Sequence, residues 1–176
     1  MIMKKIRQIS LVCYGNIARS QVHGIYLKKF LKDKGLNVKV YSVGTAPYEK
    51  YPNTPELIKE VEEKLKERKI YAKPKRNCWS DDAERELKKS DVILTADKGR
   101  KMDVISRLKG FPQKSVYTFY GFVGEGDKSF EDTYDYSKNC QDPVKFEKLF
   151  DELERIARKI MLIIKNNNLM VRANKK

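Results

Sequence analysis

An apolar run at residues 9–12 leads directly into Cys13, and five residues then separate this cysteine from Arg19, which Ser20 follows at once. The apolar run predicts a buried strand, and the amphipathic stretch that begins at Ser20 predicts a helix. The loop between them contains glycine and asparagine, so its backbone N–H groups, backed by the positive end of the helix, can form a nest for phosphate oxygens. The start of the chain therefore predicts a phosphate-binding loop after the first strand.

The residue types in this loop suit phosphoryl chemistry. A nest of this kind stabilises a thiolate at its centre as well as a bound anion, which makes Cys13 a candidate nucleophile. Arg19 supplies a planar guanidinium that matches two phosphate oxygens, and Ser20 can donate a hydrogen bond to the sulfur. The alternative is a buried structural cysteine with an arginine nearby by chance. The strand before the loop and the helix after it favour the functional interpretation.

Strands and helices alternate along the chain. The expected strands cover 6–12, 38–42, 92–94 and 116–119, and the expected helices cover 20–34, 54–68, 81–89, 100–108 and 146–164. This alternation predicts an α/β fold of one domain, with a four-stranded parallel sheet and helices on both faces. Ligands bind beyond the carboxyl ends of the strands in such folds, which is where Cys13 lies. We expect the domain to span residues 1–165 and a basic, disordered tail to cover 166–176.

Length and charge limit the possible partners. A chain of 176 residues with 40% hydrophobic residues can bury a sizeable core, which argues against global disorder. The net charge is +14, and the stretch 64–76 holds seven basic residues against one acidic residue. No nucleic-acid-binding motif accompanies this stretch, and aromatic residues are not interleaved with it, so nucleic acid is not the expected partner. A positive field attracts acidic phosphopeptides instead.

Cysteine usage and hydropathy indicate a cellular location. The three cysteines, Cys13, Cys78 and Cys140, form an odd set without close spacing, which is typical of a reducing compartment. Cys78 and Cys140 have no partner at metal-ligand spacing, so we expect neither a metal nor a cofactor. No stretch approaches the length of a membrane span, and the apolar run before Cys13 is too short for a signal peptide. The sequence therefore predicts a cytoplasmic protein with no membrane partner.

Residues 12–20 resemble the signature loop of the low-molecular-weight protein tyrosine phosphatase family. Three later segments are similar to the second-strand motif, the third-strand segment and the late Asp-Pro pair of that family: 41–45, 89–97 and the pair Asp142 and Pro143. The matches occur in the family's order and span residues 5–165. The resemblance therefore covers nearly the whole chain.

The resemblance implies hydrolysis of phosphomonoesters, above all protein phosphotyrosine, through a cysteinyl-phosphate intermediate and without a metal. Cys13 is then the nucleophile and Arg19 the phosphate clamp. The rest of the loop is implied to bind the phosphate of a phosphorylated protein or a small phosphomonoester, through Tyr14, Gly15, Asn16, Ile17, Ala18 and Ser20. Asn16 and Ser42 are implied to hold the loop in shape by hydrogen bonding.

The resemblance assigns the general acid, and the base that later activates water, to Asp142. The residues alone favour a simpler role, because an aspartate before Pro143 is a common helix cap. Asp132 and Asp135 lie in the same long polar loop, 121–142, and are rival proton donors. The sequence leaves the choice among these three carboxylates open.

Several positions depart from the family pattern. Ala18 stands where a second loop cysteine is usual, so Cys13 lacks the neighbour with which it could form a protective disulfide. Gln21 and Gly24 replace the usual proline and glutamate of the following helix, and we interpret both as tolerated changes. Ile17 is the residue type of the tyrosine-directed branch, whereas arginine phosphatases tend to carry threonine there. It points to phosphotyrosine as the substrate.

Two other functions use the same features. An arsenate reductase-like enzyme shares the fold, and Gln21 after Arg-Ser is similar to that branch. The reduction needs two further cysteines near the site, and the segment 94–97 contains none. The other alternative is a non-catalytic phosphate-binding or nucleic-acid-binding module, which the altered residues after Asp-Pro favour, Val144 and Lys145 in place of aromatic residues. The physiological substrate and the oligomeric state are open.

Overall fold

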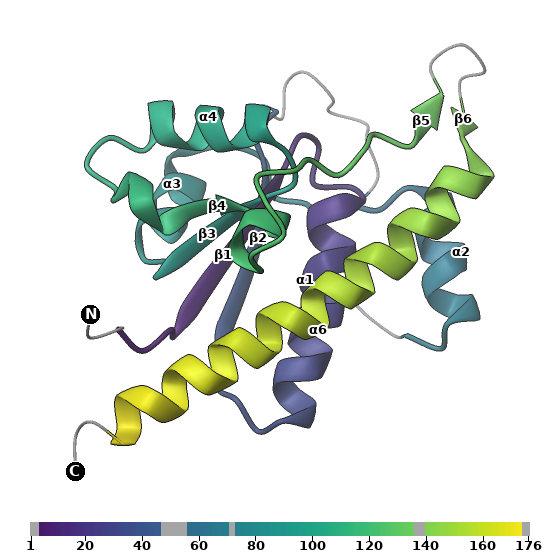
Figure 1. The fold of residues 1–176 in the computed structure, drawn as a ribbon. Helices are drawn as coiled ribbons and strands as arrows, with labels where there is room; N and C mark the ends of the chain where they lie inside the picture. Colours follow the sequence, from purple (N-terminus) through teal and green to yellow (C-terminus); the bar gives the residue numbers. More distant parts are fainter. Residues whose placement is uncertain (1–3, 47–55, 71–72, 136–139, 174–176) are drawn as a thin grey trace.

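Four parallel strands form the central sheet of the computed structural model, which describes residues 4–46, 56–70, 73–135 and 140–173. The strands are β1 (Gln8–Cys13), β2 (Lys39–Gly44), β3 (Val92–Thr95) and β4 (Val116–Thr118). Their order in the sheet is β2-β1-β3-β4, so β1 is central and Ile9 lies opposite both Val40 and Val92. The predicted α/β fold with a four-stranded parallel sheet is confirmed (Figure 1).

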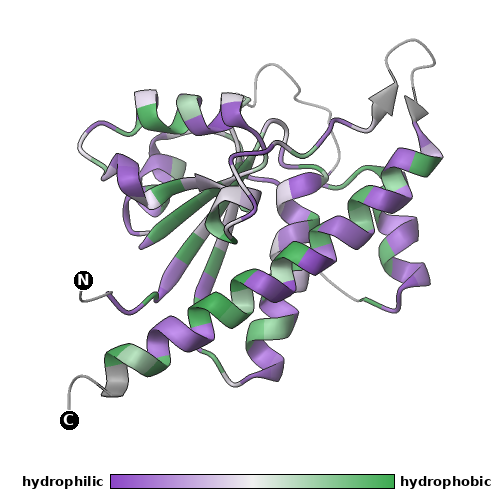
Figure 2. Cartoon of the chain, viewed as in Figure 1, coloured by the Kyte–Doolittle hydropathy of each residue, from purple (hydrophilic) through white to green (hydrophobic). Residues whose placement is uncertain are grey.

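Helices cover both faces of this sheet. They are α1 (Arg19–Asp33), α2 (Lys59–Glu67), α3 (Asp81–Lys88), α4 (Lys98–Arg107), a 3-10 turn at Gln113–Ser115, the short α5 (Phe119–Phe122) and the long α6 (Pro143–Ala173). α1 and α6 pack together on one face, and α3 and α4 lie on the other (Figure 1). Along β1, Leu11 and Cys13 belong to the cluster under α1 and α6, whereas Val12 belongs to the cluster under α3 and α4. Both central strands are therefore buried throughout, because helices exclude water from both faces, and hydrophobic residues recur along them (Figure 2).

The connections differ in detail from the sequence prediction. β4 ends one residue early because the Thr118 side chain caps α5, accepting a hydrogen bond from the Gly121 N–H at 3.0 Å. The long polar loop contains a small antiparallel pair, β5 (Tyr134–Asp135) and β6 (Cys140–Gln141). α2 begins at Lys59, after an extended backbone at Ile58, so residues 56–58 of the predicted helix 54–68 are not helical, while 54 and 55 lie outside the described residues.

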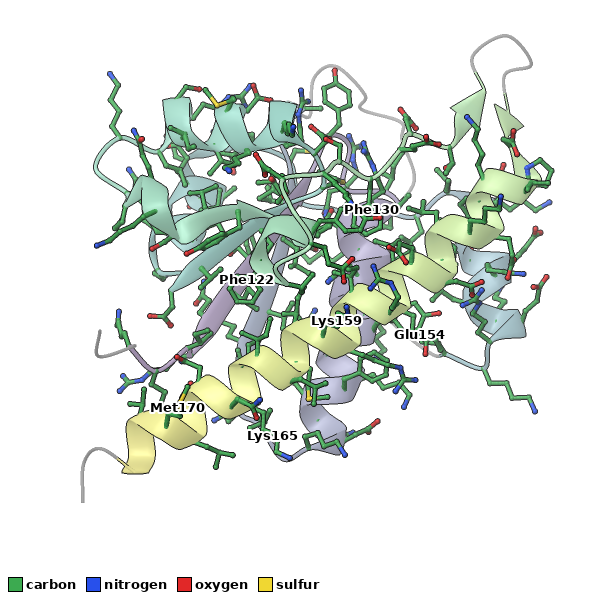
Figure 3. The ribbon with its side chains drawn as sticks, in the orientation of Figure 1. Phe122, Phe130, Glu154, Lys159, Lys165 and Met170 are labelled. Atoms are coloured by element: carbon green, nitrogen blue, oxygen red, sulfur yellow. The ribbon has the colours of Figure 1, made fainter. Side chains whose placement is uncertain are left out.

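The last helix, α6, continues well past residue 165, where the sequence predicted that the domain would end. Lys165 and Met170 both lie on this helix (Figure 3). The predicted disordered tail therefore does not match residues 166–173, which are helical, while 174–176 lie outside the described residues.

Two buried asparagines explain this extension of α6. Asn168 accepts a hydrogen bond from the Ile6 N–H at 2.9 Å and donates one from Nδ2 to the Ile6 carbonyl at 3.0 Å. Asn167 Nδ2 donates to the Lys4 carbonyl at 3.1 Å. These amides satisfy backbone groups just ahead of β1 that have no strand partner, and so they hold the end of α6 against the sheet.

Candidate active site

The loop that joins β1 to α1, residues 14–18, lies over the end of β2. Asn16 has a left-handed backbone with a φ of 54°, which turns the chain back toward the helix. The loop packs so closely on β2 that a Cβ atom at Gly44 would lie 2.5 Å from the Tyr14 carbonyl oxygen. Only glycine therefore fits at position 44.

The Cys13 sulfur lies at the base of this loop and the residue is buried. Ser20 Oγ is 2.9 Å from Sγ, and the Asn16 backbone N–H donates to Sγ at 3.3 Å. Asn16 Nδ2 donates to Ser20 Oγ at 2.8 Å, so the serine is an acceptor there and its own proton is free to point at the sulfur. The structure thus brings Cys13, Asn16 and Ser20 together in one hydrogen-bonded group that suits a thiolate.

The side chain of Asn16 is held from its other side by Asn77. The Asn77 N–H donates to Asn16 Oδ1 at 2.8 Å, and Asn77 Nδ2 donates to the Ser42 carbonyl at 2.9 Å. The support expected from Ser42 therefore runs through its main chain, and no hydrogen bond joins the Asn16 and Ser42 side chains, both of which the structure describes. Sequence reasoning missed Asn77 because it is 61 residues from Asn16 and belongs to none of the recognised motifs.

Two acceptors orient the Arg19 guanidinium. Nη1 donates to Asp97 Oδ2 at 3.4 Å and to the Phe130 carbonyl at 3.3 Å. Asp97 is itself fixed as the cap of α4, since its Oδ1 accepts a hydrogen bond from the Arg100 N–H at 2.8 Å. Sequence reasoning assigned Asp97 no role, although its position just after β3 places it at the carboxyl edge of the sheet, where the site lies.

Asp142 caps α6. Its Oδ1 accepts hydrogen bonds from the N–H groups of Val144 and Lys145, each at 3.0 Å, and its own N–H donates to the Thr133 carbonyl at 2.9 Å. This is the helix cap that the residues alone favoured. Within the described part of the chain, no hydrogen bond joins Asp142 to the phosphate loop, so the structure shows its capping role and leaves its catalytic role as a proposal.

The two rival carboxylates lie just ahead of this cap. Asp132 is exposed and precedes Thr133, whose carbonyl receives the Asp142 N–H. Asp135 belongs to β5, and its side chain lies outside the described residues.

Two arginines add positive charge around the loop. Arg76 Nε donates to the Gly15 carbonyl at 3.2 Å. The Arg100 guanidinium lies over the Tyr14 ring, 5.0 Å from its centroid, and donates from Nη1 to Thr45 Oγ1 at 3.1 Å. Positive charge at the mouth of a loop rich in N–H donors favours an anionic ligand.

His23, the single histidine, is a core residue of α1. It is fully buried and stacks on Phe119 with ring centroids 4.3 Å apart. Neither ring nitrogen has a hydrogen-bond partner among the described residues. Burial lowers the pKa of His23 to about 3, because the protein interior disfavours the charged imidazolium. His23 therefore has a packing role.

The described part of the chain contains no group of three or more metal-ligating side chains. None of its helices is long and apolar enough to cross a membrane.

A buried thiol at the base of a strand-to-helix loop, with an arginine where the helix begins, is the arrangement that the sequence predicted for a phosphate-binding enzyme of the α/β class. The family model described as low molecular weight phosphotyrosine protein phosphatase matches residues 8–170, and the chain belongs to this family. Family and fold together support phosphatase activity. A search of curated proteins found no match.

Solved structures share the fold over most of the chain. A YwlE mutant from Bacillus subtilis is 22% identical over 90% of this chain and 99% of that chain, with a TM-score of 0.75. The YwlE arginine phosphatase from Geobacillus stearothermophilus is 21% identical over 93% of this chain and 96% of that chain, also with a TM-score of 0.75. A low molecular weight protein tyrosine phosphatase from T. tengcongensis is 23% identical over 88% of this chain and 97% of that chain, with a TM-score of 0.70. At these identities the likeness shows the shared fold alone.

Proposed function

We propose that this protein hydrolyses phosphomonoesters, above all protein phosphotyrosine, through a cysteinyl-phosphate intermediate. The observation that carries the proposal is the Cys13 sulfur in contact with Ser20 Oγ at 2.9 Å and the Asn16 N–H at 3.3 Å, where α1 begins. Hydrogen-bond donors and the positive end of a helix stabilise a thiolate, which is the nucleophilic form of cysteine.

The reaction has two steps. In the first, the Cys13 thiolate attacks phosphorus, an S–P bond forms, and the P–O bond to the leaving phenol breaks as Asp142 gives its proton to that oxygen. Arg19 and the loop N–H groups hold the three non-bridging oxygens. In the second, Asp142 takes a proton from a water that attacks phosphorus, the S–P bond breaks, and inorganic phosphate leaves. Ser20 stabilises the thiolate that returns.

Asp142 is the preferred acid because its cap leaves one carboxylate oxygen available. Oδ1 accepts both N–H groups at the start of α6, and Oδ2 has no hydrogen bond to any described residue. The resemblance to the family, in which the aspartate of the Asp-Pro pair is the proton donor, supports the same choice.

Ile17 supports phosphotyrosine over phosphoarginine. Its side chain is half-buried and apolar. An apolar wall suits a phenyl ring, whereas the N–H groups of a phosphoarginine guanidinium would find no acceptor there. We therefore place phosphotyrosine first and use phosphoarginine as the competing substrate in the test.

Hydrolysis of para-nitrophenyl phosphate at mildly acidic pH tests the reaction, with Cys13→Ser as the matched variant. We expect turnover by the wild type and none by Cys13→Ser, which should still bind inorganic phosphate because the nest and Arg19 remain. A phosphotyrosine peptide should be hydrolysed faster than the same peptide carrying phosphoarginine. Activity above a trace in Cys13→Ser would show that the covalent mechanism is wrong, and the opposite substrate preference would overturn the phosphotyrosine assignment.

The same chemistry favours a cytoplasmic location. Cys13 is a free cysteine in the structure, and it acts as a nucleophile only in that form. A reducing compartment keeps thiols free, and it also supplies phosphorylated proteins as substrates.

A further inference from the structure

Gln21 is a buried polar side chain whose amide bonds to three backbone segments at once. It lies in the first turn of α1 and is 5% exposed. Nε2 donates to the carbonyl oxygens of Asn16 at 2.8 Å and Glu56 at 2.6 Å, and Oε1 accepts the Lys75 N–H at 3.3 Å. One side chain therefore ties the phosphate loop to the segments before and after α2.

The hydrogen bond from Gln21 to the Asn16 carbonyl is one of a series that leaves no carbonyl between residues 13 and 17 without a donor. Five consecutive carbonyls, from the last residue of β1 to the fourth residue of the loop, accept a hydrogen bond from a donor outside the loop: Cys13 from Thr45 N at 3.0 Å, Tyr14 from Ala46 N at 3.0 Å, Gly15 from Arg76 Nε at 3.2 Å, Asn16 from Gln21 Nε2 at 2.8 Å and Ile17 from Ile58 N at 3.3 Å. Three of these donors are backbone N–H groups. The other two are side chains, those of Arg76 and Gln21, and substitution can remove them.

A carbonyl held on the outside of the loop determines where the next N–H points. A trans peptide is planar, so its N–H points away from its C=O, and the described residues contain no cis peptide. The peptide between Gly15 and Asn16 shows the effect, since Arg76 holds the carbonyl and the Asn16 N–H donates inward to the Cys13 sulfur at 3.3 Å. By the same geometry, the hydrogen bond from Gln21 to the Asn16 carbonyl directs the N–H of the same peptide, that of Ile17, into the nest.

The chemistry at position 21 requires an amide. Proline, the usual residue of the family at this position, has no side-chain donor for the carbonyls of Asn16 and Glu56. Glutamate would place a carboxylate against both of these carbonyl oxygens. Only a side chain with a donor and an acceptor satisfies them and the Lys75 N–H together, so the replacement of proline by Gln21 is more than a tolerated change.

We propose that Gln21 is a positioning residue that, together with Arg76, aims the N–H groups of the phosphate loop at the phosphoryl group of the substrate. The inference rests on the proposed function, because the same loop binds the substrate. If Gln21 has this role, its substitution changes the affinity for phosphate and the rate of hydrolysis. If its role is purely structural, substitution changes only the stability of the protein.

The test compares Gln21→Met with the wild type, since methionine keeps the length of the side chain and removes both hydrogen-bonding groups. The dissociation constant for inorganic phosphate should rise about tenfold and kcat for para-nitrophenyl phosphate should fall by a similar factor, because one N–H is no longer aimed at an oxygen. Gln21→Glu should bind phosphate more weakly still, since a buried carboxylate repels the anion.

Ser90→Ala is the matched control. It removes two buried hydrogen bonds of Ser90 Oγ, the 2.6 Å contact with Ser10 Oγ and the 3.4 Å bond from Gln8 Nε2, and neither involves the phosphate loop. This variant should have a lower Tm and an unchanged dissociation constant for phosphate. Arg76→Met removes the other side-chain donor from a less buried residue, so it keeps the test decisive if Gln21→Met does not fold. Its dissociation constant for phosphate should rise more than that of Arg100→Met, which removes an equal charge beside the loop but no bond to a loop carbonyl.

The outcomes separate this inference from the proposed function. Variants of Gln21 and Arg76 that lose stability but keep wild-type phosphate affinity and kcat would overturn the positioning role. A wild type that binds phosphate without turning over para-nitrophenyl phosphate would contradict the proposed function, while the phosphate affinities would still decide the role of Gln21. A wild type that does not bind phosphate would overturn both.

Discussion

The Arg19 guanidinium and the Asp97 carboxylate form an ion pair in which Nη1 lies 3.4 Å from Oδ2. Asp97 also caps α4 through the Arg100 N–H, so one carboxylate connects Arg19, the proposed phosphate clamp, to a helix on the opposite face of the sheet. An ion pair that is still in contact with solvent contributes little to stability. The role of this pair is therefore to orient Arg19.

Asp97→Asn tests that role. Asparagine keeps the capping acceptor, so the Tm should change little, whereas the loss of charge releases Arg19 from its partner. We expect kcat/KM for para-nitrophenyl phosphate to fall about tenfold, with weaker phosphate binding. Kinetics and a thermal unfolding curve check both parts. A wild-type kcat/KM in this variant would mean that the Phe130 carbonyl alone positions the guanidinium.

Asp142→Asn separates catalysis from capping, because asparagine caps a helix as well as aspartate does but cannot supply the proton. The rate should fall strongly for phenyl phosphate and less for para-nitrophenyl phosphate, whose phenolate needs less protonation. The Tm should stay near that of the wild type. Asp132→Asn and Asp135→Asn are the matched controls and should keep the wild-type dependence on the leaving group. If one of them shows the loss instead of Asp142→Asn, that residue is the proton donor and Asp142 is only a cap.

His23→Phe should change how stability depends on pH. The pKa of His23 is about 3 in the folded protein against an ordinary value of 6.5, so the unfolded chain binds the proton more readily. The wild type therefore loses stability as pH falls below 6.5, down to about 3. Phenylalanine keeps the stack on Phe119 and cannot be protonated. The difference in unfolding free energy between the variant and the wild type should therefore be about 2 kcal/mol larger at pH 5 than at neutral pH, in favour of the variant.

Urea unfolding of both proteins at several pH values between 7 and 5 measures this difference. Its change with pH is the relevant quantity, since any effect of the larger ring on packing is the same at each pH. A constant difference across that range would contradict the neutral, buried state of His23.

Asn168→Ala should release the end of α6 from the chain ahead of β1. The N–H and the C=O of Ile6 both lose their side-chain partner, so we expect a loss of about 2 kcal/mol of unfolding free energy. Amide exchange at Ile6 should become faster, and kcat should not change. Asn166→Ala is the control, because Asn166 is exposed on the same helix and should tolerate the change. Equal stabilities of the two variants would mean that the Asn168 bonds contribute nothing net.

The strand, the loop and the helix at the start of the chain were predictable because their signals are local. Hydrophobic periodicity and turn-forming residues act between neighbours in sequence, so the position of Cys13 at the end of a buried strand followed from residues close to it. The alternation of strands and helices likewise predicted a parallel sheet covered on both faces. The end of α6 was predicted less well, since Asn167 and Asn168 look polar and tail-like until their backbone partners are known.

The α/β class and the loop between the first strand and helix, with Cys13 and Arg19 at its ends, could be recognised from the order of the residues alone, because both depend on short stretches of chain. The long-range partners of polar side chains could be known only from the folded chain: the Asn77 bond that supports the loop at Asn16 spans 61 residues, the Asp97 bond that orients Arg19 spans 78, and the Asn168 bond that holds the end of α6 at Ile6 spans 162. The donor or acceptor that a polar side chain finds depends on which segments packing brings beside it. Gln21 shows this most clearly, because its three backbone partners meet only after the sheet and its helices have assembled.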